Sequence, residues 1–226
     1  MSEPALSQCV DLEAHPLDST SYRQQCKRTL DASGVLCLGG FLRAETIAKL
    51  CAEGEAQRHL VYFTDGGHNV YLAPEDPAFD SDHPRNRQVV SSKGCIQTDQ
   101  IPEASALHVL NDSAVLREFL CAVLDEPALY KYADTLSSIN LYFTDEGREL
   151  GWYFDNSSFA IALLIQHAEG GGEFEYVRDA RNADADDMNY PLVGDEGSLV
   201  LFRGRDALHR VTPTTGSRER MLAVLA

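Results

Sequence analysis

The sequence has little of what would place it in several large classes of protein. Basic residues are few: 19 Lys and Arg stand against 35 Asp and Glu, which gives a net charge of −16. Phosphate backbones and anionic lipid repel so acidic a chain, so we expect no nucleic-acid or membrane partner. No apolar run approaches the ~20 residues that cross a bilayer, and the N-terminus has no basic-then-apolar signal pattern. We therefore expect a cytoplasmic protein.

Several catalytic motifs are also absent. The chain has no G-x-S-x-G elbow, no Walker loop and no strand-G-x-G-x-x-G-helix unit, which excludes the common hydrolase, nucleotide-triphosphatase and dinucleotide-binding folds. Its six cysteines contain no C-x-x-C pair. That scatter favours reduced, individually buried thiols over a disulfide framework or a zinc knuckle.

The length of 226 residues predicts a single domain with additional peripheral segments. Residues 1 to about 30 are polar, contain Pro4 and Pro16 and show no sustained period, so we expect a tail or a loosely docked arm. Residues 31–226 would then form a single domain, with the barrel core described below at about 136–226.

Two helices and one buried strand are predicted before that core. The apolar run 34–42 is bounded by glycines and is typical of a buried strand, and the segment after it has helical spacing. A second amphipathic helix follows, with Asp112 as its expected N-cap. The apolar positions of the two helices are Ile47, Leu50 and Cys51, then Leu116, Phe119, Leu120 and Val123.

The stretch from Tyr62 to Ile101 is rich in Asp, Gly, Pro, Asn and His and shows only scraps of strand. A segment this long without its own period is usually a functional loop, so we expect a lid over the site. His68 and His83 lie in this stretch, where a histidine is more often solvated than a metal ligand.

From Leu136 the apolar period changes from helical to two. Ile139, Leu141 and Phe143 point to one face, while Asn140 and Tyr142 point to the other and could face a ligand. Four more apolar runs follow, at 159–166, 174–177, 198–202 and 221–225. Helices first and strands afterwards predict an α+β fold, with a double-sheet barrel or sandwich and helices on one outer face.

The C-terminal half also contains the residues with chemical potential. Asp155 lies at a strand edge, His209 follows 209 − 155 = 54 residues later, and Arg218 and Arg220 come soon after. A carboxylate and a histidine on neighbouring strands suit a metal ion, and an inward arginine in so apolar a strand needs an anionic partner. This pattern indicates a metal site with an anion clamp.

These motifs resemble the Fe(II)/2-oxoglutarate-dependent dioxygenases, whose fold is the double-stranded β-helix or jelly-roll. LGWYFDN is similar to their W-H-x-D strand, GGGEFEYV to the glycine turn and returning strand, and GSLVLFRGRDALHRVTP to the strand before the distal histidine. GSRER matches the G-x-R element that binds the distal carboxylate of 2-oxoglutarate. The resemblance covers roughly the C-terminal 90 residues.

The resemblance implies the cofactors Fe(II) and 2-oxoglutarate, with dioxygen and a small molecule as substrates. It implies Asp155 and His209 as metal ligands and Arg218 as the carboxylate anchor. Arg220 lies two residues further on and could share or replace that role, and Asn140 and Tyr142 are candidates for facing the cosubstrate.

One residue departs from the family pattern. Tyr153 stands where the family has its first histidine, and a neutral phenol is a poor ligand for Fe(II). Three alternatives stay open: Tyr153 ligates the metal, another group or water completes an Asp155 and His209 site, or metal binding is lost. In the last case the protein would be a catalytically silent jelly-roll that binds a small anion or partners an active homologue. A homodimer that covers the apolar strand 221–225 is a further expectation.

Overall fold

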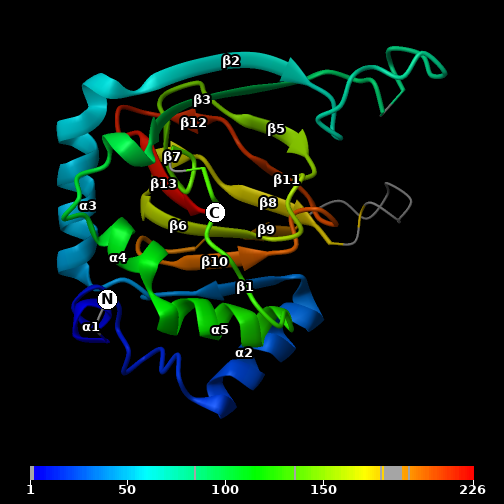
Figure 1. The fold of residues 1–226 in the computed structure, drawn as a ribbon. Helices are drawn as coiled ribbons and strands as arrows, with labels where there is room; N and C mark the ends of the chain where they lie inside the picture. Colours follow the sequence, from blue (N-terminus) through cyan, green and yellow to red (C-terminus); the bar gives the residue numbers. More distant parts are fainter. Residues whose placement is uncertain (1–2, 84, 135, 179, 181–189, 193) are drawn as a thin grey trace.

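A computed structural model describes residues 3–83, 85–134, 136–178, 180, 190–192 and 194–226. Within these residues, eleven strands form one sheet that curls on itself (Figure 1). They are β1 (Val35–Leu38), β2 (Tyr62–His68), β3 (Val89–Gln97), β4 (Ile139–Thr144), β5 (Leu150–Tyr153), β6 (Ala160–Gln166), β8 (Phe174–Val177), β9 (Tyr190–Leu192), β10 (Leu199–Phe202), β11 (Leu208–Val211) and β13 (Arg220–Leu225).

The strands pair antiparallel in the order β1-β10-β6-β13-β4-β3-β5-β11-β8-β9, and β2 pairs with β3 at the side. Two short strands, β7 (Gly170–Gly171) and β12 (Thr214–Thr215), form a separate ribbon. Neighbours in the sheet are mostly distant in the sequence, which is the connectivity of a jelly-roll rather than of a meander. The predicted α+β fold with a jelly-roll core is confirmed.

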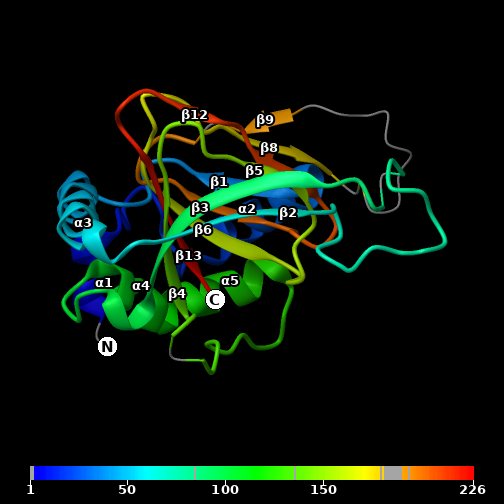
Figure 2. The ribbon, with the colours of Figure 1, turned by 90° about the horizontal axis from the view of Figure 1, so that it is seen from above.

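Within the described part of the chain, five helices cover one outer face of the sheet (Figure 2). They are α1 (Glu3–Cys9), α2 (Thr20–Ser33), α3 (Ala44–Gln57), α4 (Ala106–Asp112) and α5 (Ala114–Leu124), with two short 3₁₀ turns, η1 (Arg58–Leu60) and η2 (Thr98–Gln100). None of the helices in the described ranges is long and apolar enough to cross a membrane.

The strands place alternate residues on two different faces. On β4, Ile139, Leu141 and Phe143 belong to the main hydrophobic cluster under the helices. Tyr142 and Thr144 face the inside of the curled sheet instead. β6, β10 and β13 follow the same rule, so each strand contributes one row to the core and one row to the interior of the barrel. This alternation creates the site described below.

Both predicted helices form, and one predicted cap is wrong. The apolar positions of α5 are all buried, and its N-cap is Ser113, whose hydroxyl accepts a hydrogen bond from the Leu116 amide at 3.1 Å. Asp112 is instead the last residue of α4. A break of one residue separates α4 from α5, and the sequence pattern did not reveal the first of these helices.

The N-terminal segment is not a loosely docked arm. It forms α1 and α2, and Leu6, Val10, Leu17 and Leu30 are all buried in the main cluster. α2 ends beyond residue 30, at a left-handed Gly34 with φ 78°. The domain therefore includes these helices, and its sheet also includes strands that precede residue 136.

The stretch 62–101 contains more sheet than we predicted. β2 and β3 pair along their whole lengths, and β3 joins β4 in the centre of the curled sheet. Only the turn-rich segment between them, residues 69–83 and 85–88, resembles the expected loop. The strand β13 lies between β4 and β6, so the reason for expecting a homodimer, an uncovered last strand, is removed.

Candidate active site

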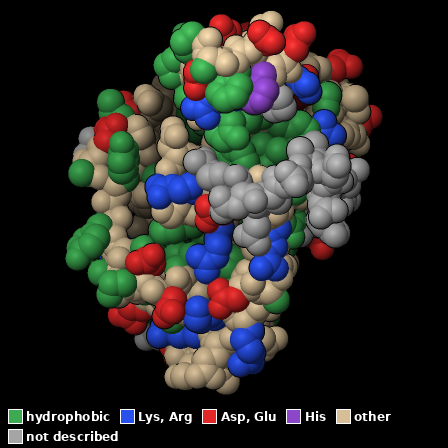
Figure 3. Space-filling model, turned by 90° about the vertical axis from the view of Figure 1, so that its right-hand side faces the viewer, with side chains coloured by type: hydrophobic (Ala, Val, Ile, Leu, Met, Phe, Trp, Pro, Cys, Tyr) green, Lys and Arg blue, Asp and Glu red, His purple; other side chains and the backbone are tan. Residues whose placement is uncertain are grey.

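The curled sheet encloses a cavity of about 310 Å³, a size typical of small-molecule sites. Apolar side chains form most of its wall. The polar residues that line it include Lys93, Tyr142, Thr144, Tyr153, Asp155, His209 and Arg220. Figure 3 views the end of the molecule at which residues 69–83 and 85–88 project, with Lys and Arg side chains gathered among acidic ones in its lower half.

The three candidate metal ligands meet in this cavity. His209 on β11 pairs in register with Tyr153 on β5, and their ring centroids are 4.3 Å apart. The Nε2 atom of His209 lies 3.7 Å from an Asp155 carboxylate oxygen. Residues two apart on an extended strand share a face, which explains why Tyr153 and Asp155 point the same way.

The surroundings fix the tautomer of His209. Its Nδ1 lies 2.9 Å from the carbonyl oxygen of Ala207, and since a carbonyl only accepts, Nδ1 is the nitrogen that donates. Burial lowers the pKa of His209, although Asp155 opposes this shift, so the ring is neutral at neutral pH. The lone pair of Nε2 therefore points toward Asp155, as a metal ligand requires.

Asp155 is held from its other side by a glycine. Its amide donates to the carbonyl oxygen of Gly204 at 2.9 Å, and a Cβ at position 204 would clash with the Asp155 carboxylate. Burial raises the pKa of Asp155, opposed by His209 and then by Lys93. Gly204 belongs to the LFRGRD turn and is a supporting residue that sequence reasoning missed.

The two arginines of the GSRER element are placed differently. The side chain of Arg218 is 53% exposed and lies 3.8 Å from Glu196. Arg220 is 6% exposed and lines the cavity, and its buried Nε has no hydrogen-bond partner among the described residues. Burial lowers the pKa of Arg220 to about 10, opposed by Tyr153, so the guanidinium is charged at pH 7. Arg220, rather than Arg218, is available to an anion in the cavity.

The other sequence candidates divide in the same way. Tyr142 lines the cavity, and burial raises its pKa to about 12. Asn140 is absent from the lining, and its amide donates to the carbonyl oxygen of Ser137 at 3.0 Å. Lys93 and Thr144 also line the cavity and were not predicted. Lys93 was missed because it lies in the stretch that we expected to be a loop.

Neither histidine of the predicted lid lines the cavity, although the ring of His68, the last residue of β2, lies edge-on to that of Tyr153 with centroids 5.8 Å apart. His68 contacts Ser91 Oγ through Nε2 at 2.5 Å and the carbonyl oxygen of Asn69 through Nδ1 at 3.0 Å, so both ring nitrogens have partners. His83 stacks on Phe79 with ring centroids 4.3 Å apart. In the described part of the chain, no group of three or more His, Cys, Asp and Glu side chains could hold a metal ion.

The side chains in the cavity therefore match two of the three ligands that iron needs, and they include a cation suited to the carboxylate of 2-oxoglutarate. Asp155 and His209 supply one oxygen and one nitrogen donor, as two of the three residues of an iron facial triad do. Tyr153 occupies the third place as a phenol whose pKa is raised by burial and then by Asp155. The unpaired buried nitrogen of Arg220 fits a carboxylate, as the distal end of 2-oxoglutarate requires.

A second hollow of about 400 Å³ meets the first at Asp155, Ala160 and Val224. Its wall comes from α4, α5 and the segment 129–132, and it includes the exposed Tyr130 and Tyr132. This hollow offers room for a second small molecule beside the carboxylate of Asp155.

No protein-family model and no curated protein matches this chain, but many solved structures share its fold. A 2OG-Fe(II) oxygenase-family oxidoreductase from Burkholderia pseudomallei matches with a TM-score of 0.59 and 12% identity over 89% of this chain and 88% of that one. A Pseudomonas putida prolyl-4-hydroxylase matches with a TM-score of 0.58 and 14% identity over 90% of this chain and 97% of that one. The alpha-ketoglutarate-dependent epimerase SnoN from nogalamycin biosynthesis matches with a TM-score of 0.61 and 9% identity over 91% of this chain and 82% of that one.

These similarities establish the fold. The chain has the double-stranded β-helix of the 2OG-Fe(II) oxygenases, with Tyr153, Asp155 and His209 together in the barrel interior. Identities this low carry no information on substrate or activity.

Proposed function

We propose that the protein is a non-haem iron, 2-oxoglutarate-dependent oxidoreductase that acts on a small molecule and has an altered metal shell. The observation that carries the proposal is that Asp155 and His209, with carboxylate oxygen and Nε2 3.7 Å apart, share one cavity with Arg220, whose buried Nε has no partner among the described residues. A carboxylate and histidine pair with an inward arginine is the minimum needed to hold both a metal and a dicarboxylate.

In this proposal each residue has a separate task. Asp155 and His209 would hold the iron, and Arg220 would bind the distal carboxylate of 2-oxoglutarate. With iron bound, the site would couple oxidative decarboxylation of the cosubstrate to oxidation of a C–H bond by dioxygen. The apolar walls would exclude water, and the adjoining hollow beside Asp155 would hold the substrate.

Tyr153 decides between versions of this site. It could ligate as a phenolate, it could stay a neutral neighbour while water completes an Asp155 and His209 site, or it could prevent metal binding altogether. A phenolate favours Fe(III) and gives a visible charge-transfer band, which Tyr153→Phe would remove. The second version gives a colourless site that retains iron in the same variant.

A second candidate function is a catalytically silent barrel that binds a small anion. It is favoured by one specific observation: the described residues offer no third acidic, histidine or cysteine donor, and none of them hydrogen-bonds to the buried Nε of Arg220. Metal analysis of protein purified without chelator separates the two functions. Iron at one equivalent together with succinate release from 2-oxoglutarate supports the oxygenase, and the absence of both supports the silent barrel.

Calorimetry tests the anchor directly. We expect Arg220→Met to weaken 2-oxoglutarate binding about 30- to 3,000-fold, since a charge-assisted contact to a buried anion is worth about 2–5 kcal/mol. Arg218→Met is the matched control and should bind like the parent, because Arg218 is exposed and paired with Glu196. Equal binding by both variants and the parent would show that neither arginine anchors the cosubstrate.

A cytoplasmic location belongs to the same proposal. It is supported by the six cysteines, which form no disulfide. We propose dioxygen and a small molecule as the substrates, with no nucleic-acid or membrane partner.

A further inference from the structure

Lys93 is a second cation in the cavity, and the proposed function does not use it. It lies on β3 and is half-buried, with its ammonium 4.1 Å from the centroid of the Tyr142 ring. The described residues form no hydrogen bond or ion pair with this ammonium. The face of the Tyr142 ring replaces little of the solvation that a cation loses on burial, and burial lowers the pKa of Lys93, although Cys95 and Asp155 oppose this shift.

The sheet register places Lys93 and Arg220 side by side across one strand. Tyr142 on β4 pairs with Cys95 on β3 and with Leu222 on β13. Lys93 and Arg220 each lie two residues before those partners, on strands that both run antiparallel to β4. Both side chains therefore point inward at the same level, flanking Thr144, with backbones about 10 Å apart, or two strand spacings.

The charges inside the cavity do not balance among themselves. Arg220 and Lys93 are cations, Asp155 is the one interior carboxylate among the described lining residues, and Glu173 is exposed at the rim. His209 is neutral. An excess of positive charge in the interior of a chain with a net charge of −16 is unusual unless a ligand supplies the missing anion.

We infer that Lys93 binds the second carboxylate of a dicarboxylate whose first carboxylate is bound by Arg220. The cavity thereby recognises a short dianion through two protein cations, whether or not a metal is present. Two long side chains that start about 10 Å apart and converge on one cavity leave room for a chain of about five carbons. This inference rests on the proposed role of Arg220 and extends it to the selection of the ligand.

The test uses two ligands of equal length that differ in one charge. Glutarate is a five-carbon dianion without a keto group to chelate metal, and pentanoate is the matching monoanion. We measure their binding by calorimetry on the full chain in the presence of a chelator. The parent should bind glutarate about 10- to 100-fold more tightly than pentanoate.

Lys93→Met should remove that difference and leave pentanoate binding unchanged, because the methionine keeps the apolar stem against Tyr142 and loses only the charge. Lys93→Arg should restore much of the preference for glutarate. Lys49→Met is the matched control, since Lys49 is exposed on α3 and far from the lining of the cavity.

Two results would overturn the inference while leaving the proposed function intact. One is a Lys93→Met variant that binds glutarate like the parent while Arg220→Met does not. The other is a parent that binds 2-oxoglutarate only with iron and does not distinguish glutarate from pentanoate. If no dicarboxylate binds with or without iron, the inference and the proposed function both fail. A Lys93→Met variant that does not fold is replaced by Lys93→Gln, judged by the same criteria.

Discussion

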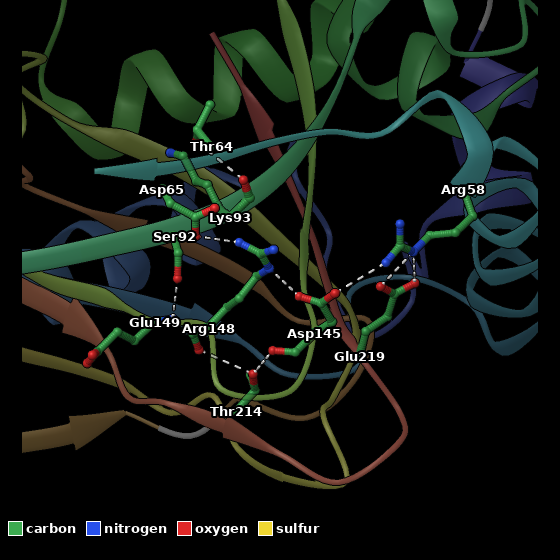
Figure 4. Close-up of polar contacts among 10 residues, drawn as sticks. All are labelled: Arg58, Thr64, Asp65, Ser92, Lys93, Asp145, Arg148, Glu149, Thr214 and Glu219. Carbon is green, nitrogen blue, oxygen red and sulfur yellow. Dashed lines mark hydrogen bonds and ion pairs between the residues drawn. The ribbon is translucent and has the colours of Figure 1, made fainter. Parts of the chain in front are cut away.

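The cations on the two faces of this sheet have opposite environments. Outside the barrel, the Arg58 Nε donates to both carboxylate oxygens of Glu219, at 3.0 and 2.9 Å. Arg148 donates to Asp65 at 2.7 Å and pairs with Asp145, which also lies 3.5 Å from Arg58 (Figure 4). These contacts form a continuous chain of ion pairs. Inside the barrel, Arg220 and Lys93 form no comparable ion pair with any residue that the structure describes.

Adjacent residues show this contrast most directly. Glu219 points outward to Arg58, and Arg220, the next residue, points into the cavity. Both outer guanidinium groups also lie over the ring of Phe63. The guanidinium carbon is 4.7 Å from the ring centroid for Arg58 and 4.3 Å for Arg148. Paired charges stabilise the fold or leave its stability unchanged, whereas a buried unpaired charge destabilises it. The inner cations are therefore best explained by a ligand, and the two faces should respond differently to substitution.

The largest expected effect comes from the inner face at Tyr153. Tyr153→His would place a second nitrogen donor beside Asp155 and His209, and Fe(II) affinity should rise about 100-fold or more. The thermal stability of the metal-free protein should change little, because the residue lines a cavity and is not part of the hydrophobic core. Metal titration followed by calorimetry measures both quantities. Unchanged affinity would mean that position 153 is not a ligand position.

Substitution of Arg220 should show that the buried charge on the inner face lowers the stability of the ligand-free fold. Arg220→Met removes a buried charge whose Nε has no partner among the described residues, so the free energy of unfolding of the ligand-free protein should increase by about 2 kcal/mol. Urea unfolding at pH 7 measures it, and added dicarboxylate should then stabilise the parent and not the variant. If the variant is less stable than the parent, Arg220 has a structural partner and the contrast between the two faces is wrong.

Arg58 should show the opposite sign on the outer face. Arg58→Met leaves the largely buried Glu219 without its cation and should lower the free energy of unfolding by about 1 kcal/mol at pH 7, a value reduced because Arg58 is one-third exposed. Burial already raises the pKa of Glu219 above its ordinary value of 4.5, and Arg58 opposes this shift.

The pH dependence checks the cause of this loss. A carboxyl whose folded pKa is raised destabilises the fold when ionised and not when protonated, and without Arg58 that pKa rises further. The loss should therefore shrink as the pH falls through the folded pKa toward 4.5. A loss that is independent of pH would come from the packing of the Arg58 stem against Phe63 and Phe143.

The parts of the fold and of the candidate site that could be predicted are those determined by residues close together in the sequence. The period of two at Ile139, Leu141 and Phe143 is a local property, and the structure confirms the strand and its faces. The common face of Tyr153 and Asp155 follows from the same rule. The choice between Arg218 and Arg220 does not, because β13 begins only at Arg220 and the residues before it form a turn.

The strands missed by sequence reasoning are stabilised by tertiary contacts. SSKGC in β3 has the composition of a turn, yet it pairs with β2 on one side and with β4 and β5 on the other. Gly94 is required there because a Cβ would clash with Val61 and Phe63. Leu6, Val10 and Leu17 show no helical period across Pro16, and they are buried in the main hydrophobic cluster, where α1 packs against α3 and α4. Such burial is determined by distant partners and is invisible in a short window.

The smallest expected effect concerns the segment 69–83 and 85–88, which contrasts with both faces of the sheet. It is organised by two buried asparagines: Asn86 donates to the carbonyl oxygens of Asp76 and Phe79, and Asn69 donates to that of Ala73. Few of its amides belong to a strand ladder, so they should exchange with solvent faster than those of β3 and β4.

This segment also contacts the strand that carries the site. The carbonyl oxygen of Val70 accepts a hydrogen bond from the Phe154 amide at 2.8 Å, Tyr71 stacks on Phe154, and Leu72 lines the cavity. Ligand binding should therefore slow exchange in this segment, by about tenfold if it stabilises the closed position by about 1.4 kcal/mol. Hydrogen exchange with and without dicarboxylate measures the change, with the distant helix α3 as the internal reference. Protection equal to that of β3 without ligand would show that the segment is part of the rigid barrel and does not act as a lid.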